Sequence, residues 1–272
     1  MIFVNPPQRN HRADFRRLSQ GRGDETAQLL RSAASNVFRA YDRYFERSAD
    51  ASRIRRLRAD ADTRTALESN YEILRRRSGY GELLEITNGR CPMCGFGEAS
   101  TLDHYLPRSV YPEFSVFALN LLPACARCNL LKGTAVGRTP AEQFLHCFFH
   151  RVPSIPLLIC RVDVQPGTLL VEFRIRRSRH IDADILARLS YHFRQLHLAT
   201  RFRREALNEL GDRRATFDTY VGNGNHIVLR AHLRKEARGL LTTLGPNHWK
   251  TALYSALYRN RGFWTAGFRN VR

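Results

Sequence analysis

Residues 91–133 read CPMCGFGEASTLDHYLPRSVYPEFSVFALNLLPACARCNLLKG, and the motifs in this segment predict the structure of the region around it. It begins with the pair Cys91 and Cys94 and contains near its end the pair Cys125 and Cys128, each spaced Cys-x-x-Cys. Two such pairs supply the four thiolates of a tetrahedral zinc site. Four thiolates leave no open coordination position, so we predict that the zinc is structural.

The segment between the two pairs is longer than an ordinary zinc ribbon allows, and it carries polar residues of its own. Asp103 and His104 stand together in a short run typical of a strand. Neighbouring side chains of a strand point to opposite faces, so one of the two can hold a metal ion while the other faces water. A histidine has an ordinary pKa near neutrality, which suits a general base that activates water.

This order of residues resembles the HNH endonucleases, whose ββα-metal motif runs Cys-x-x-Cys, Asp-His, Pro, Asn-Leu, Cys-x-x-Cys-Asn and Lys-Gly. The match covers residues 88–135, roughly a fifth of the chain. The resemblance implies that His104 is the general base and that Asp103 and Asn129 bind one divalent ion. It also implies that Asn120 hydrogen-bonds the intervening loop and orients the histidine. The candidate contacts to nucleic acid are Lys132, Arg108 and Arg127.

Two features depart from the commonest form of the motif. Asn129 stands where many relatives carry histidine, and an amide oxygen favours hard ions, so we expect Mg²⁺ or Mn²⁺ at the catalytic site. The glycine pair of many relatives is absent from residues 108–114, which leaves the loop conformation before Asn120 open. Residues 103–125 are similar to HNH subunits of anti-phage systems of the Septu and retron-associated type, which implies a regulatory ATPase as partner.

Charge points to an acidic partner. The chain has 44 Lys+Arg against 25 Asp+Glu, a formal net charge of +19, which is typical of proteins that bind nucleic acid and of some that bind anionic membranes. A GC-rich genome would explain the preference for arginine over lysine, although not the excess over acidic residues. We expect no membrane association and a cytoplasmic location, because the sequence contains no spanning apolar run and no signal peptide.

The whole chain is predicted to be α+β and mostly helical, with the zinc-stabilised ββα-metal core between two helical regions. A helix is expected to begin at Asp24 as N-cap, and two β-rich runs around Pro166-Gly167 predict a hairpin near residues 157–177. The predicted parts are an extended basic arm at 1–23, a helical region at 24–87, the nuclease core at 88–140, and a hairpin with helices at 141–272.

The predicted function is metal-dependent cleavage of DNA, as the effector of an anti-phage defence system. One alternative is an effector that cleaves RNA such as tRNA, which shares the site and differs in substrate. Another is a non-catalytic zinc module that binds nucleic acid or protein. Such a module would keep the four cysteines but would not need the four polar residues Asp103, His104, Asn120 and Asn129 together.

Overall fold

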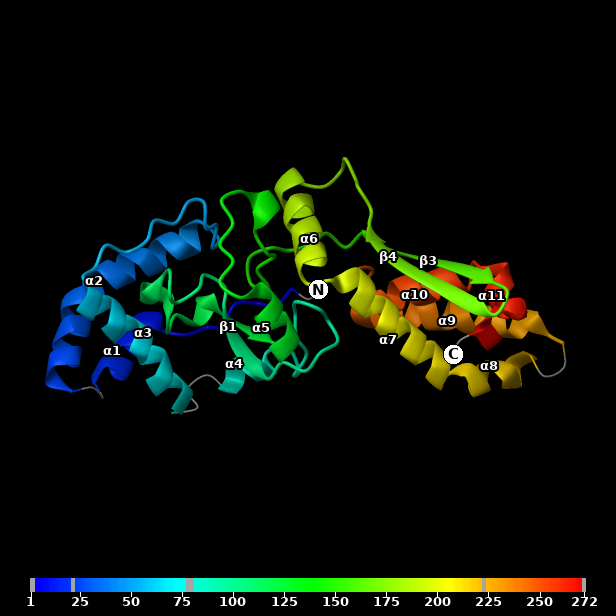
Figure 1. Ribbon diagram of the computed structural model, residues 1–272, viewed down its shortest axis with the longest axis horizontal. Coiled ribbons are helices and arrows are strands. Elements are labelled where there is room, and N and C mark those ends of the chain that lie inside the picture. The colour runs from blue at the N-terminus through cyan, green and yellow to red at the C-terminus, as the bar shows by residue number, and fades with distance from the viewer. Residues whose placement is uncertain (1–2, 21–22, 77–80, 222–223, 271–272) are drawn as a thin grey trace. The chain divides into compact units, whose positions relative to one another are not determined.

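The computed structural model describes residues 3–20, 23–76, 81–221 and 224–270. Over these ranges the chain is α+β and mostly helical, as predicted, with two separate two-stranded antiparallel sheets (Figure 1). The chain divides into two compact units. The first contains Met1–Val152 and Ala187–His192, and the second contains Pro153–Leu186 and Phe193–Arg272.

Three helices open the first unit: α1 (His11–Gln20), α2 (Asp24–Glu46) and α3 (Ala61–Arg76). The predicted helix from Asp24 is confirmed, but its N-cap is Gly23 and no side chain caps it. Leu30, Val37 and Tyr44 are fully buried and lie seven residues apart on α2. This spacing places them in one stripe, which faces the core.

The extended arm predicted for residues 1–23 is wrong in its second half, where α1 lies. The Asn10 side chain accepts a hydrogen bond from the Ala13 N–H at 3.0 Å, which begins the helix. Phe15 is 1% exposed, and its ring meets that of Phe38 of α2 edge-on. The segment is therefore helical because α2 buries one of its faces, and a contact between distant segments does not show in the local sequence.

A short hairpin and a helix follow in the same unit. α4 (Gly81–Glu85) precedes β1 (Thr101–His104), which pairs with β2 (Leu121–Ala124), and α5 (Ala126–Lys132) follows β2 directly. The loop between the strands contains two 3₁₀ turns, η1 (Pro112–Phe114) and η2 (Ala118–Asn120). Its aromatic rings pack on α2: Phe117 stacks on Tyr41 with ring centres 4.0 Å apart. A further turn, η3 (Pro140–Glu142), comes later.

The second unit is built on the hairpin of β3 (Leu158–Gln165) and β4 (Thr168–Ile175), which confirms the predicted hairpin. Gly167 has a φ of 71°, a conformation that glycine adopts readily and that the tight turn requires. One hairpin face, with Val162 and Val171, is buried, and the other is polar. α6 (Ala183–Gln195) is divided between the units, because its residues Ala187–His192 belong to the first. The other helices of the second unit are α7 (Leu198–Asp212), α8 (Arg214–Val221), α9 (His226–Leu244), α10 (Trp249–Leu257) and α11 (Arg261–Thr265), followed by η4 (Gly267–Asn270). In the described ranges, no helix combines the length and apolar character needed to cross a bilayer.

Candidate metal centre and active site

Four cysteines form one buried cluster in the first unit. The sulfur atoms of Cys91, Cys94, Cys125 and Cys128 all lie within 4.8 Å of one another, and those of Cys94 and Cys125 are 4.0 Å apart. Four sulfurs at ~2.3 Å from a tetrahedral Zn²⁺ would be separated by ~3.8 Å. The cluster therefore fits a structural zinc ion, as the spacing predicted, and its thiols are free rather than disulfide-bonded.

The backbone around the cluster directs N–H groups at the sulfurs. Gly97 N–H donates to Cys94 Sγ at 3.3 Å, and Cys128 N–H donates to Cys125 Sγ at 3.4 Å, where Cys125 caps α5. Hydrogen bonds among the four thiols lower the pKa of Cys125 and Cys94 and raise the pKa of Cys91 and Cys128. The remaining protons of the cluster must leave when a metal ion binds. A Cβ at Gly97 would lie 3.0 Å from Cys125 Cβ and Sγ, so a larger residue there would push against a cysteine of the cluster.

His104 lies at the end of β1 with its ring held from one side. Its Nε2 is 2.9 Å from the carbonyl oxygen of Ser115. A carbonyl only accepts hydrogen bonds, so Nε2 carries the proton and Nδ1 has a free lone pair. Among the described residues, Nδ1 has no hydrogen-bond partner. Burial lowers the pKa of His104 to about 4, so the imidazole is neutral at pH 7.

The residues that cover the His104 ring come from α3. The Tyr71 ring meets it edge-on, with ring centres 4.5 Å apart. Tyr71 also lies under the guanidinium of Arg108, 5.0 Å from the ring centre, and Glu72 accepts a hydrogen bond from Arg108 at 3.0 Å. Arg108, a candidate contact to nucleic acid, is therefore already paired within the unit.

Asp103 points to the opposite side of β1, toward α5. It is 4% exposed, and the ammonium of Lys132, itself 3% exposed, lies 3.0 Å from Asp103 Oδ2. Lys132 also donates to the carbonyl oxygen of His104 at 2.6 Å. Burial raises the pKa of Asp103, and the ammonium opposes that rise. Lys132 was predicted to contact nucleic acid, but in this structure its charge faces Asp103 rather than the surface.

Asn129 lies on the same helix as Lys132 and faces the same strand. Its side-chain amide donates to Thr101 Oγ1 at 3.2 Å, and Thr101 is two residues before Asp103 on one face of β1. The two predicted metal ligands, Asp103 and Asn129, are thus both at the contact between β1 and α5, although no hydrogen bond joins them directly. Arg127, on the exposed side of α5, has no ion pair among the described residues.

Asn120 is fully buried and closes the loop between the strands. Its Oδ1 accepts from Leu106 N–H at 2.8 Å, and its Nδ2 donates to the carbonyl oxygens of Leu106 and Phe114 at 3.0 and 3.3 Å. One amide therefore joins both ends of the loop. Ser115, which holds His104, comes directly after Phe114, so the loop connects Asn120 to the histidine.

Two residues outside the motif complete this network. The Tyr44 hydroxyl donates to Asn120 Oδ1 at 3.0 Å and lies 3.1 Å from His146 Nε2. His146 Nδ1 accepts from Phe148 N–H, so Nε2 carries its proton, and Leu119 O lies 3.1 Å from it. Sequence reasoning missed these roles, because a tyrosine on the apolar face of a helix and a histidine among phenylalanines both have the pattern of ordinary core residues.

Removal of the Tyr44 hydroxyl should loosen the loop between β1 and β2. In Tyr44→Phe, Asn120 Oδ1 keeps only one of its two donors, and the loss of one hydrogen bond costs about 0.5–1.5 kcal/mol. We expect faster amide hydrogen exchange over residues 105–115, measured by mass spectrometry. Tyr258→Phe is the control, because the Tyr258 hydroxyl makes no hydrogen bond to any residue in the described part of the chain. Equal exchange in the two variants would mean that Tyr44 does not hold the loop.

Comparison with known proteins finds two partial similarities. The chain is 27% identical to protein ea31 of Escherichia phage lambda over 219 residues, which cover 74% of this chain and 74% of that protein. It is 44% identical to the Septu protein PtuB of Bacillus thuringiensis over 57 residues, 19% of this chain and 22% of that protein. No family model matches the chain, and no solved structure matches it.

Proposed function

We propose that this chain is a metal-dependent HNH endonuclease that hydrolyses phosphodiester bonds, in DNA first and in RNA second. The observation that carries the proposal is the state of His104: Ser115 holds its Nε2–H, and its Nδ1 is neutral and unpartnered among the described residues. A neutral imidazole oriented by a backbone carbonyl is suited to take a proton from water. A purely structural zinc module has no need of such a group.

Asp103 and Asn129 would hold the catalytic Mg²⁺ or Mn²⁺. Asp103 Oδ2 is a buried oxygen without a hydrogen bond, although the Lys132 ammonium is close, and Asn129 Oδ1 has no partner in the described part of the chain. Carboxylate and amide oxygens are ligands that these hard ions prefer. When bound, the ion neutralises the charge that develops on the phosphate.

The charges at this site favour joint binding of metal and substrate. Asp103 is paired with the ammonium of Lys132, so the pair is neutral as a unit and attracts a divalent cation weakly. A phosphodiester brings the missing negative charge, and Mg²⁺ in proteins is commonly bound by one or two carboxylates together with substrate phosphates. We therefore propose that the ion binds firmly only together with the nucleic acid.

In the proposed reaction, His104 Nδ1 accepts a proton from water while the water oxygen bonds to phosphorus. The bond from phosphorus to the leaving sugar oxygen breaks on the opposite side, and that oxygen keeps the electron pair and takes a proton from solvent water. Ser115 O keeps its hydrogen bond to Nε2–H throughout and stabilises the positive charge that the ring gains. Asn120 and Tyr44 hold the loop that carries this carbonyl, which keeps Nδ1 directed at the water.

The similarity to the Septu protein PtuB supports a role in anti-phage defence. We propose that the chain acts there as the nuclease component and that a regulatory ATPase of the same system controls it. A nuclease with a net charge of +19 would otherwise bind the nucleic acid of its own host, because phosphate contacts need no sequence.

Cleavage assays with two substrates test this function. We expect the purified chain to nick plasmid DNA, and to cleave tRNA more slowly, with Mg²⁺ or Mn²⁺ but not without added divalent ions. Chain co-purified with the products of neighbouring genes should be tested in parallel, since the partner controls the rate. Binding of both substrates without metal-dependent cleavage, in both preparations, would favour the non-catalytic zinc module instead. Faster cleavage of tRNA would identify an RNA-cleaving effector.

A further inference from the structure

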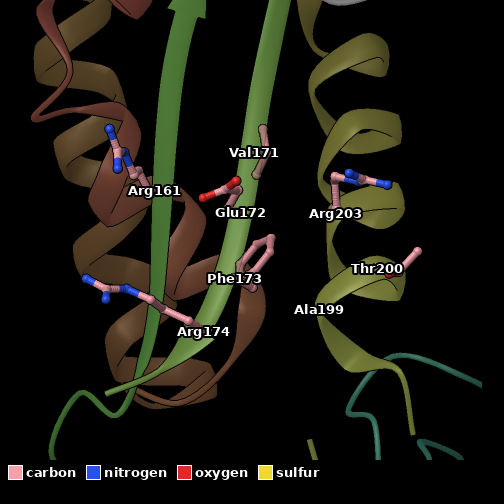
Figure 2. Close-up of a pocket in the computed structure, with 8 residues that line it drawn as sticks. All are labelled: Arg161, Val171, Glu172, Phe173, Arg174, Ala199, Thr200 and Arg203. Atoms are coloured by element: carbon pink, nitrogen blue, oxygen red, sulfur yellow. The ribbon is translucent and has the colours of Figure 1, made fainter. Parts of the chain in front are cut away.

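A basic groove lies in the second unit, between β4 and α7. It encloses about 400 Å³, and its floor contains the buried side chains of Val171 and Phe173. The exposed side chains along it include three arginines, Arg161 of β3, Arg174 of β4 and Arg203 of α7 (Figure 2). The candidate catalytic residues lie in the first unit, so the groove is separate from the site described above.

These arginines line one groove but come from three elements of the second unit. Arg161 pairs with Glu172 across the hairpin, and Arg174 is two residues further along β4, so both arginines are on the polar face of the hairpin. Arg203 is on α7, one turn after Thr200, and its side chain extends away from β4 (Figure 2). Arg161 and Arg174 extend from the hairpin on the side away from α7, so the three guanidinium groups are spread apart and do not converge on one point (Figure 2). Such a spread suits an extended chain of phosphates better than a single small anion.

None of the three arginines has an ion pair among the described residues. Glu172 is the cross-strand neighbour of Arg161, yet no salt bridge forms between them. The groove therefore keeps a positive potential that the protein itself does not neutralise. The second unit as a whole also carries more than half of the excess positive charge of the chain.

In the first unit, by contrast, two of the cations that the motif offers for substrate binding are paired with carboxylates of the protein itself. Lys132 is buried against Asp103, and Arg108 is paired with Glu72. A nucleic acid bound for cleavage needs further contacts to its phosphates, which supply much of the affinity in such complexes. Guanidinium groups bind phosphate in a bidentate manner and remain charged at all physiological pH values.

We propose that the groove between β4 and α7 binds the phosphodiester backbone of a nucleic-acid strand through Arg161, Arg174 and Arg203. The identity of this ligand rests on the proposed nuclease function. The groove contacts phosphates and so adds affinity without reading sequence. Thr200 can add a neutral hydrogen bond from its hydroxyl, and Glu172 weakens the interaction because its carboxylate repels phosphate.

The test is a binding measurement on the full chain in the His104→Ala background, which prevents cleavage. The groove variant replaces Arg161, Arg174 and Arg203 with alanine. The matched control replaces three exposed cations of α9 that do not line the groove, and it removes the same charge; these are Arg234, Lys235 and Arg238. Fluorescence anisotropy follows labelled single-stranded DNA, RNA of the same sequence, and the DNA duplex over a range of salt concentrations.

We expect the groove variant to bind at least about tenfold more weakly than the parent, and the control variant to change by less than about threefold. Loss of three phosphate contacts should also reduce the slope of log K against log salt by about 2 for single strands and about 3 for duplex. The nucleic acid that loses most affinity identifies the backbone that the groove holds. Equal losses in the groove and control variants would overturn the proposal, because they would show a response to net charge alone.

A second variant tests the groove without removing a cation. Glu172→Gln keeps the shape of the side chain and removes the only carboxylate that lines the described groove. We expect tighter binding, by several-fold, and unchanged or weaker binding would count against the proposal. Binding without metal-dependent cleavage by the chain with His104 intact, both alone and co-purified with the products of neighbouring genes, would overturn the nuclease function and would not affect the groove proposal. If the groove variant made with His104 intact cleaved nucleic acid and bound it as tightly as the unmodified chain, the groove proposal would be overturned and the nuclease function would stand.

Discussion

Replacement of His104 with alanine is expected to reduce the rate of metal-dependent cleavage by about 10²- to 10⁴-fold, the usual contribution of a general base. His104 is the only group in the described site that combines a neutral nitrogen, an unpartnered lone pair and a fixed orientation. Measured rates should be single-turnover rates on nucleic acid already bound, so that a change in affinity does not enter the comparison.

Alanine also removes the donor to the Ser115 carbonyl, so the variant should be modestly less stable. His104→Gln retains an amide that can donate there but cannot act as a base, and it should be as inactive as the alanine variant. His180→Ala, which removes an exposed histidine of the second unit, is the control and should cleave at the parental rate. A folded, zinc-loaded His104→Gln variant with near-parental cleavage would exclude His104 as the base.

The second large effect is expected from the cysteine cluster. Cys125→Ser should bring zinc content well below one per chain and lower the melting temperature of the first unit. The binding free energy of a structural zinc is also folding free energy, on the order of 10 kcal/mol in small zinc domains. Serine is itself a good N-cap, so α5 keeps its cap and the loss reports on the metal.

Cys147→Ala is the matched control, because Cys147 is also buried in the first unit but lies outside the cluster. Its zinc content should remain that of the parent, measured by atomic absorption on the purified protein. If Cys125→Ser retained full zinc content and an unchanged melting temperature, the cluster would not be a structural zinc site.

Local patterns in the sequence were sufficient to predict several features of the structure. The Cys-x-x-Cys spacing predicted the cluster, because each pair folds through its own tight turn and needs only one long-range contact to meet the other. The alternation of Asp103 and His104 between faces follows from the period of a strand. The β3–β4 hairpin follows from two β-rich runs around Gly167.

The sequence does not show which of the polar residues of the motif are free and which are paired, because this depends on tertiary packing. Lys132 has the same local pattern whether it faces solvent or Asp103, and its burial depends on how α5 packs on β1. Tyr44 meets Asn120 across 76 positions of sequence, and Arg203 joins Arg161 in one groove through the packing of α7 on β4. Periodicity determines the face on which a side chain lies, whereas its partner depends on long-range packing, which no local pattern contains.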